Sequence, residues 1–254
     1  MIRIHLAEGE EGCRLAVERR AVAVIVDALR ASATAAGLLE AGALEICAVR
    51  EVEEALAMKK IWPDALLYGE RGGLPPEGFD FGNSPAEAFH AKGRRVVFTT
   101  TTGAGRLISA SGAKAALMAT TTNDTALMDY LCAEKTEELV IIPAGLAGDP
   151  DFDGQEDWVA AVWLADQCVR HQELGAHLRW GEGEENYCYY RERIEKEGVK
   201  ALFHSAPHAD KLRAISMEKD IDFCAQTGIC NALPVMVGPC GSGVLLQAWT
   251  PGSD

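Results

Sequence analysis

The sequence has few basic residues for its acidic content, which argues against a nucleic-acid-binding function. It carries 24 lysines and arginines against 38 aspartates and glutamates, and its formal net charge is −14. Proteins that bind nucleic acids usually show the opposite balance. An acidic surface also repels anions at long range, so an anionic substrate would need local arginines or a metal ion in order to bind.

The sequence also lacks long apolar runs. The run from Ala21 to Val26 stops at Asp27, far short of the length of a membrane span. The N-terminal residues 1–12 have neither the basic start nor the apolar stretch of a signal peptide. We therefore expect a cytoplasmic protein that has no membrane partner.

The cysteines form no Cys-x-x-Cys pair, which argues against a zinc ribbon. In a cytoplasmic protein we expect all eight cysteines to be reduced. His204 and His208 are four residues apart, but Pro207 between them argues against a zinc-binding helix. We predict that both histidines lie in a loop.

The chain is long enough for one large domain, since it has 254 residues of which 48% are hydrophobic. No repeat, low-complexity tract or clear linker divides it. We expect one domain over residues 1–254, with a boundary near residues 145–175 if it is built from two lobes.

Short strand-like runs alternate with helical patterns along most of the chain. The predicted strands are Ile2–Leu6, Val22–Val26, Leu44–Ala48, Leu66–Tyr68, Arg95–Phe98, Ala115–Met118, Leu139–Ile142, Val235–Val237 and Val244–Trp249. The predicted helices are Thr34–Glu40, Val52–Lys60, Pro85–Ala91, Ala104–Ser111, Asn123–Ala133, Gln155–Arg170, Glu182–Glu197, Pro207–Ala214 and Met217–Ala225. This alternation predicts a three-layer α/β/α fold, with helices on both faces of a mainly parallel sheet that is mixed at its edge.

Polar or glycine-rich clusters follow four of the predicted strands. Asp27, Glu70, the Thr99–Thr102 run and the Ala144–Gly148 segment each come directly after an apolar run. The carboxyl ends of parallel strands meet at one edge of a sheet, where ligands bind. The sequence therefore predicts a ligand-binding crevice at this edge.

Two of these clusters pair an acid with a base. Asp27 and Arg30 stand three residues apart, and Glu70 and Arg71 are neighbours inside a glycine-rich segment. A carboxylate of this kind can hold a cation, and an arginine can clamp an anion with two hydrogen bonds. A salt-bridged strand end, or a flexible loop in the second case, would produce the same pattern.

The segment that follows adds a turn and a helix start. Asp80 could complete a set of carboxylates or fix the turn. Ser84 and Pro85 fit the cap and first turn of a helix, and Glu87 stands where a capping box has its acid. The N-terminus of such a helix would suit an anion.

Two further segments carry weaker signals. The run from Thr99 to Arg106 is rich in threonine and glycine and could bind phosphate through hydroxyl and backbone donors, although it is not a Walker loop. Gln155, Glu156 and Asp157 open a long helix, where acids complement the helix dipole. The dipole is a sufficient explanation for these acids, and a catalytic role is the less favoured alternative.

Taken in order, several segments of the chain resemble the 2-phosphosulfolactate phosphatases. The matching segments are VIVDALRASAT, YGERGG, GFDFGNSPAEA, VVFTTTTGAGRL, the region from Gly148 to Asp157 and the stretch HADKLRAISMEKDIDFCAQTGICNALPVM. The resemblance covers most of the chain, from about residue 22 to residue 235. GERGG followed by GFD-x-GNSP is its most specific signature.

The resemblance implies a magnesium-dependent, cytoplasmic α/β enzyme that acts on a small anionic phosphate ester. Members of the family hydrolyse 2-phosphosulfolactate to sulfolactate and phosphate, a step towards coenzyme M in organisms that make it. The site residues implied by the matching motifs are Asp27, Arg30, Glu70, Arg71, Asp80, Asn83 and Ser84.

A metal-dependent hydrolysis needs carboxylates for the cation and positive groups for the phosphoryl oxygens. We assign Mg²⁺ binding to Asp27, Glu70 and Asp80, and anion binding to Arg30 and Arg71, so that Asp27, Glu70 and the two arginines form the catalytic set. Substrate contacts are assigned to Gly72, Gly73, Asn83, Ser84, Thr100, Thr101 and Gly103.

Other functions remain open at this level. The family usually has Asn-Gly-Thr where Thr102-Gly103-Ala104 stands here, and the segment from Asp149 to Gly154 is longer than usual. A metal-dependent lyase or isomerase acting on a phosphorylated acid, or a non-catalytic anion-binding homologue, would fit the same crevice. An aspartyl-phosphate mechanism is disfavoured because Leu29 stands where a second acid would be needed, and homo-oligomer formation is left open.

Overall fold

The computed structural model describes residues 1–146 and 152–252. Its ten strands are β1 (Ile2–Leu6), β2 (Val22–Val26), β3 (Glu45–Ala48), β4 (Leu66–Gly69), β5 (Arg95–Thr99), β6 (Ala115–Met118), β7 (Glu138–Pro143), β8 (Leu178–Trp180), β9 (Pro234–Cys240) and β10 (Gly243–Ala248). Its α-helices are α1 (Gly9–Arg19), α2 (Ala31–Glu40), α3 (Val52–Ile61), α4 (Gly103–Ser109), α5 (Asp124–Ala133), α6 (Gln155–Arg170), α7 (Gln172–Gly175), α8 (Glu184–Glu197), α9 (Val199–His204), α10 (Pro207–Ala214) and α11 (Glu218–Cys224). Two 3₁₀ helices, η1 (Pro85–Ala91) and η2 (Thr121–Asn123), complete the described elements.

The described strands form one sheet in the order β4-β5-β3-β10-β9-β6-β2-β7-β1-β8. Two parallel blocks, β4-β5-β3 and β6-β2-β7-β1-β8, are joined by the β9–β10 hairpin, whose pairings with β3 and β6 are antiparallel. The predicted α/β class with a mainly parallel sheet is confirmed. The antiparallel strands, however, lie in the middle of the sheet and not at its edge as predicted. The prediction of one domain over residues 1–254 stays a prediction.

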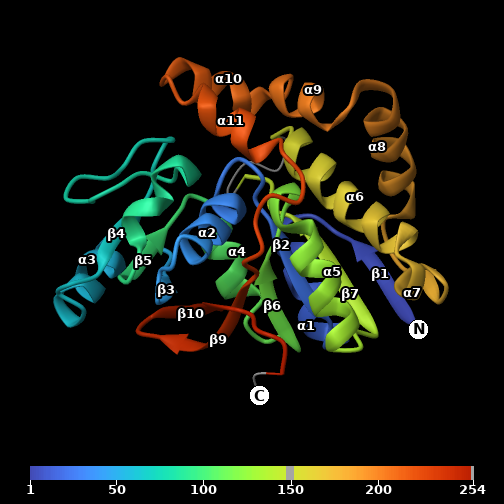
Figure 1. Ribbon diagram of the computed structural model, residues 1–254, viewed down its shortest axis with the longest axis horizontal. Helices are drawn as coiled ribbons and strands as arrows, with labels where there is room; N and C mark the ends of the chain where they lie inside the picture. Colours follow the sequence, from blue (N-terminus) through green and yellow to red (C-terminus); the bar gives the residue numbers. More distant parts are fainter. Residues whose placement is uncertain (147–151, 253–254) are drawn as a thin grey trace.

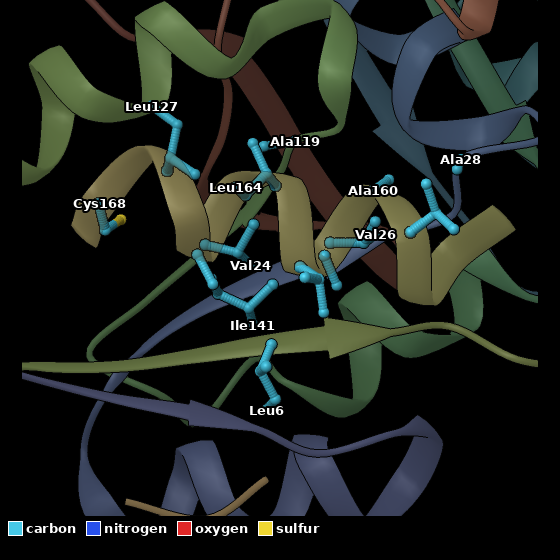
Figure 2. Close-up of a cluster of buried hydrophobic side chains, with 14 of the residues drawn as sticks. Leu6, Val24, Val26, Ala28, Ala119, Leu127, Ile141, Ala160, Leu164 and Cys168 are labelled. Carbon is cyan, nitrogen blue, oxygen red and sulfur yellow. The ribbon is translucent and has the colours of Figure 1, made fainter. Parts of the chain in front are cut away.

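Side chains alternate between the two faces of the sheet, as the period of a strand requires. On β2, Val24 and Val26 face a core formed with α5 and α6, whereas Ala23 and Ile25 face a core formed with α1, α2 and α4. Both faces are covered, so the strand reads as a continuous apolar run. Figure 2 shows Val24 and Ile141 of the sheet meeting Leu164 of α6 in the first of these cores.

The sequence analysis did not predict several of the helices and strands that the structure contains. The helix α1 was not predicted, although its last turn has a clear stop signal: Arg20 adopts a left-handed conformation, and its backbone N–H bonds the carbonyls of Ala16 and Val17. The short elements β8 and α9 were also missed. None of the described helices is long and apolar enough to cross a membrane.

The start of η1 differs from its predicted form. Ser84 does not cap the helix, because its hydroxyl donates to the Asp220 carboxylate at 2.7 Å. Glu87 accepts a hydrogen bond from the backbone of Gly82 and not from Ser84. The predicted capping box is therefore wrong, and the segment folds as a 3₁₀ helix.

Helices α8 to α11 form an arch along the top of Figure 1, at the opposite end of the view from the β9–β10 hairpin. His204 ends α9, and His208 lies in the first turn of α10. The predicted loop is wrong here because Pro207 occupies the first position of α10, where its missing N–H and fixed φ are tolerated. The proline that seemed to break a helix begins one.

A disulfide joins two strands that lie far apart in the sequence. Cys47 on β3 and Cys240 at the end of β9 are bonded, with their Cα atoms 5.8 Å apart and a sequence separation of 193. The other six cysteines are free. The prediction of eight reduced thiols is therefore wrong.

We expect thiol titration of freshly purified protein, denatured without reductant, to count six thiols, because Cys47 and Cys240 are paired. Reduction before titration should raise the count to the eight of the sequence. The Cys47→Ser and Cys240→Ser double variant is the control and should give six under both conditions, from eight minus two. A count of eight in the unreduced wild type would contradict the pairing.

Candidate active site

A cavity of about 250 Å³ lies where the carboxyl ends of several strands approach the helical arch. Its floor includes Asp27, which follows β2, and Glu70, which follows β4. Its cover includes His208 and Lys211 of α10. The predicted site residues that line this cavity are Asp27, Arg30, Glu70, Gly72, Gly73, Asn83 and Thr101.

Asp27 is held at the floor by the backbone that follows it. Its Oδ1 accepts a hydrogen bond from the Ala31 N–H at 3.0 Å, and its own N–H donates to Ser32 Oγ. A Cβ atom added to Gly103 would lie 2.7 Å from Asp27 Oδ2, so glycine is needed here for close approach. Gly103 therefore makes room for Asp27 and does not itself line the cavity.

Asp157, in the first turn of α6, is the second carboxylate of the floor. Its two oxygens accept hydrogen bonds from the backbone N–H groups of Ala28 at 2.7 Å and Gly145 at 3.0 Å. These bonds tie α6 to the loops that follow β2 and β7. The helix dipole was the favoured explanation for this acid, with a catalytic role as the alternative, and the structure places Asp157 in the cavity lining.

Burial and the charges of neighbouring carboxylates raise the pKa values of both aspartates. For Asp27 the main cause is burial, and the charges of Glu70 and Glu156 raise its pKa further, while the Ala31 N–H and His208 lower it. For Asp157 burial again comes first, followed by the charges of Glu156 and Asp27, and its pKa lies well above the ordinary value. Several carboxylates thus crowd around one point, which disfavours their ionised forms unless positive charge is present.

Glu70 braces the two loops of the other parallel block. Its Oε2 accepts a hydrogen bond from the Gly73 N–H at 2.9 Å, and its Oε1 accepts one from the Thr101 N–H at 2.7 Å. Gly73 has a φ of +85°, which favours glycine. Glu70 is thus close enough to Asp27 to raise the pKa of that aspartate. Its two backbone contacts also hold the loops that form the cavity wall.

Arg30 lies against the cavity but is strongly engaged. Its guanidinium donates to Asp220 Oδ2 at 2.5 Å and to the Gly73 carbonyl at 2.9 Å. The side chains of Arg30 and Asp220 are 2% and 3% exposed, so the ion pair is shielded from water. Ser84 completes the network from the other side of Asp220. Removing one partner of such a buried pair typically costs about 3–5 kcal/mol of stability.

Arg71 and Asp80 are among the predicted site residues that lie outside the cavity lining, as Ser84, Thr100 and Gly103 also do. Arg71 donates to the carbonyls of Glu70 and Arg50, each at 2.7 Å, and to the Thr99 hydroxyl. Asp80 accepts a hydrogen bond from the Leu67 N–H at 2.8 Å and is exposed on its turn. Both side chains hold loops in place, and the structure does not bring either one to Asp27.

The remaining predicted residues divide between the lining and its support. Thr101 and Asn83 line the cavity, and the Oδ1 atom of Asn83 is buried without a hydrogen-bond partner among the described residues. Thr100 accepts a hydrogen bond from the Ala104 N–H and so supports the start of α4. Gly148 and the segment from Asp149 to Asp151 lie outside the described residues.

The helical arch supplies lining residues that sequence reasoning missed. His208 Nδ1 lies 3.1 Å from Glu156 Oε1, and Lys211 Nζ lies 4.6 Å from the centre of the Phe152 ring. The signal was available, since residues 207–214 were predicted to be helical. Because Pro207 was interpreted as a helix breaker, His208 was assigned to a loop and was not considered as a residue of the site.

The oxygen donors at the cavity floor fit a hard divalent cation. Asp27 and Asp157 are neighbouring carboxylates that repel each other, and a cation between them would relieve that repulsion. Among residues 1–146 and 152–252, no three acidic, histidine or cysteine side chains form a complete metal site by themselves. Mg²⁺ commonly uses one or two carboxylates together with water and substrate phosphate, so a partial set suits it.

Comparison with known proteins finds similarity to 2-phosphosulfolactate phosphatases over most of the chain. A family model described as "2-phosphosulpholactate phosphatase" matches residues 10–239. A protein of Thermus thermophilus named "Probable 2-phosphosulfolactate phosphatase" is 35% identical over 230 residues, which cover 89% of this chain and 92% of that protein. A protein of Deinococcus radiodurans with the same name is 34% identical over 227 residues, covering 85% and 88%.

We expect Asp27→Asn to stabilise the metal-free protein at high pH. Because the folded pKa of Asp27 is raised, its contribution to stability is complete below the ordinary pKa of about 4 and is lost as the pH rises through the folded value. The asparagine variant should therefore gain free energy of unfolding relative to wild type as the pH rises above about 4. Each tenfold change in proton affinity corresponds to about 1.4 kcal/mol.

Urea unfolding in the presence of EDTA, repeated at several pH values, measures this difference. The control is Asp129→Asn, which removes an exposed carboxylate of α5 far from the cavity lining. If the stability difference between Asp27→Asn and wild type does not grow with pH, Asp27 is not a strained carboxylate.

Proposed function

Because the chain belongs to the 2-phosphosulfolactate phosphatase family, whose members are phosphoric monoester hydrolases, we propose that it hydrolyses 2-phosphosulfolactate to sulfolactate and phosphate with the help of Mg²⁺. The observation that carries this proposal is the pair of crowded carboxylates, Asp27 and Asp157, at the floor of the cavity. Metal-assisted hydrolysis needs a cation next to the phosphoryl group, and these two carboxylates could bind it.

We assign the cation to Asp27 and Asp157, with Glu70 at the edge of the set. When bound there, Mg²⁺ would supply positive charge to the oxygens of the transferred phosphoryl group. Asp157 is oriented by two backbone N–H groups and Asp27 by one, so these oxygens are fixed before a ligand enters. Such preorganisation avoids rearrangement during the reaction.

Positive side chains around the cavity would hold the anionic groups of the substrate. Arg30 is fixed by Asp220 and Gly73, and a guanidinium still offers N–H groups beyond those two bonds. Lys211 stands on the opposite wall, on α10. An ester that carries phosphate, carboxylate and sulfonate needs several such groups, particularly in a protein whose net charge is −14.

The cavity also limits the size of the substrate. A volume of about 250 Å³ suits a small phosphorylated acid. Leu212 of α10 and Ile215, which directly follows that helix, add apolar surface to the cavity lining. We therefore favour a small acidic phosphate monoester as the substrate class.

We expect the purified protein to release phosphate from 2-phosphosulfolactate when Mg²⁺ is present and to lose this activity in EDTA. Phosphate should be assayed in parallel with sulfolactate, and 2-phospholactate, which lacks the sulfonate, should be the weaker substrate. Consumption of the ester without phosphate release would indicate a lyase or isomerase. Binding of the ester without turnover would indicate a non-catalytic anion-binding protein.

The metal assignment is tested by calorimetric titration with Mg²⁺. We expect Asp27→Asn to weaken Mg²⁺ binding by about tenfold or more, since it removes a direct carboxylate ligand. Asp80→Asn is the matched control, because Asp80 is an exposed turn residue outside the cavity lining. Equal Mg²⁺ affinity in wild type and Asp27→Asn would show that Asp27 does not bind the cation.

A further inference from the structure

His208 combines two properties that a proton-transfer group needs. It lines the cavity that contains Asp27 and Asp157, and its side chain is 30% exposed. Its Nδ1 atom lies 3.1 Å from Glu156 Oε1, so one ring nitrogen is fixed by a carboxylate. Within residues 1–146 and 152–252 its Nε2 atom makes no hydrogen bond, which leaves that nitrogen available to a ligand.

The burial of Glu156 distinguishes the partner of His208 from an ordinary surface carboxylate. Its side chain is 1% exposed, and its Oε2 atom is buried without a hydrogen-bond partner among the described residues. Such a half-satisfied buried carboxylate is costly unless a positive charge lies beside it. The contact with Glu156 therefore fixes the orientation of the His208 ring.

The surroundings of the ring restrict it further. Phe152 packs edge-on to His208, with the ring centres 6.1 Å apart, and Lys211 lies over the other side of that phenylalanine. The titratable and charged groups around the cavity are Asp27, Arg30, Glu70, Asp157, Glu156, His208 and Lys211.

The other groups are poorly suited to deliver a proton to a ligand. Asp27 and Asp157 are the residues assigned to the cation, and both oxygens of Asp157 and of Glu70 already accept backbone N–H bonds. Arg30 does not release its proton in the range where proteins function. His208 is the cavity-lining group with an imidazole whose free nitrogen can carry and release one.

Hydrolysis of an alkyl phosphate ester has a specific requirement for such a donor. As the bond between phosphorus and the ester oxygen breaks, its electron pair stays on an oxygen that is a poor leaving group unless it is protonated. A positioned acid accelerates such a step by about 10²- to 10⁴-fold. Esters of more acidic alcohols, such as 4-nitrophenol, leave without this help.

We propose that His208, held by Glu156, donates the proton that the ester oxygen takes up as it leaves. A water oxygen bonds to phosphorus, the bond from phosphorus to the ester oxygen breaks, and the proton moves from His208 Nε2 to that oxygen to give the alcohol. One of the two protons of the attacking water passes through solvent and restores the protonated histidine. This assignment rests on the proposed phosphatase function.

The test compares an alkyl and an aryl ester. We expect His208→Asn to lower kcat/KM on 2-phosphosulfolactate by about 10²- to 10⁴-fold and to lower it by less than about tenfold on 4-nitrophenyl phosphate. His204→Asn is the matched control: His204 also pairs with a carboxylate, Asp222 at 3.2 Å, but lies outside the cavity lining. It should resemble wild type on both esters.

Glu156→Gln separates the positioning role from the donor itself. Glutamine keeps an acceptor for the Nδ1–H group but removes the negative charge, so we expect an intermediate loss that is again larger on the alkyl ester. Thermal melts check that each variant is folded, and His208→Gln replaces His208→Asn if the latter is not.

The outcomes are distinguishable. Equal losses on the two esters, or no loss on either, would overturn the donor role while leaving the phosphatase function intact. A wild-type protein that releases phosphate from neither ester would overturn the phosphatase function and the donor role with it. A selective loss on the alkyl ester in His208→Asn, absent in His204→Asn, supports the assignment.

Discussion

Repulsion among carboxylates is the constraint around which the cavity is built. The charge of Asp27 raises the pKa of Asp157, and the charges of Glu156 and Glu70 raise the pKa of Asp27. The neighbouring structure answers this with backbone N–H groups from Ala28, Gly145 and Ala31 and with the positive side chains of the surrounding wall. A chain as acidic as this one can attract an anionic ester only where such local charge outweighs its overall field.

The two parallel blocks of the sheet contribute different parts of the site. Asp27 and Asp157 belong to the block that contains β2 and β7, whereas Glu70 and Thr101 belong to the block that contains β4 and β5. The buried pair of Arg30 and Asp220 crosses between the first block and the helical arch, and Gly73 brings the second block to the same guanidinium. The geometry of the cavity therefore depends on contacts among three regions that are distant in sequence.

Sequence reasoning identified the strands and the residues directly after them, because apolar runs and the polar residues that end them are local signals. It therefore found Asp27 and Glu70. It could not find the partner of Ser84, since Asp220 lies 136 residues away, nor the pairing of Cys47 with Cys240. It underestimated Asp157 because a helix dipole explained an acid at that position, and it misjudged His208 because Pro207 permits two interpretations. Local sequence patterns therefore predicted the strands, whereas contacts between distant residues became visible only in the structure.

The position of the β9–β10 hairpin has a consequence for the biosynthesis of the protein. The two strands at the centre of the sheet, β9 and β10, are synthesised after all the other described strands, since they span residues 234–248. Until they arrive, β3 and β6 present open edges of the kind that promote association between nascent chains. The two parallel blocks are thus joined only once the hairpin has been made, and a chain truncated before Pro234 would keep both edges exposed.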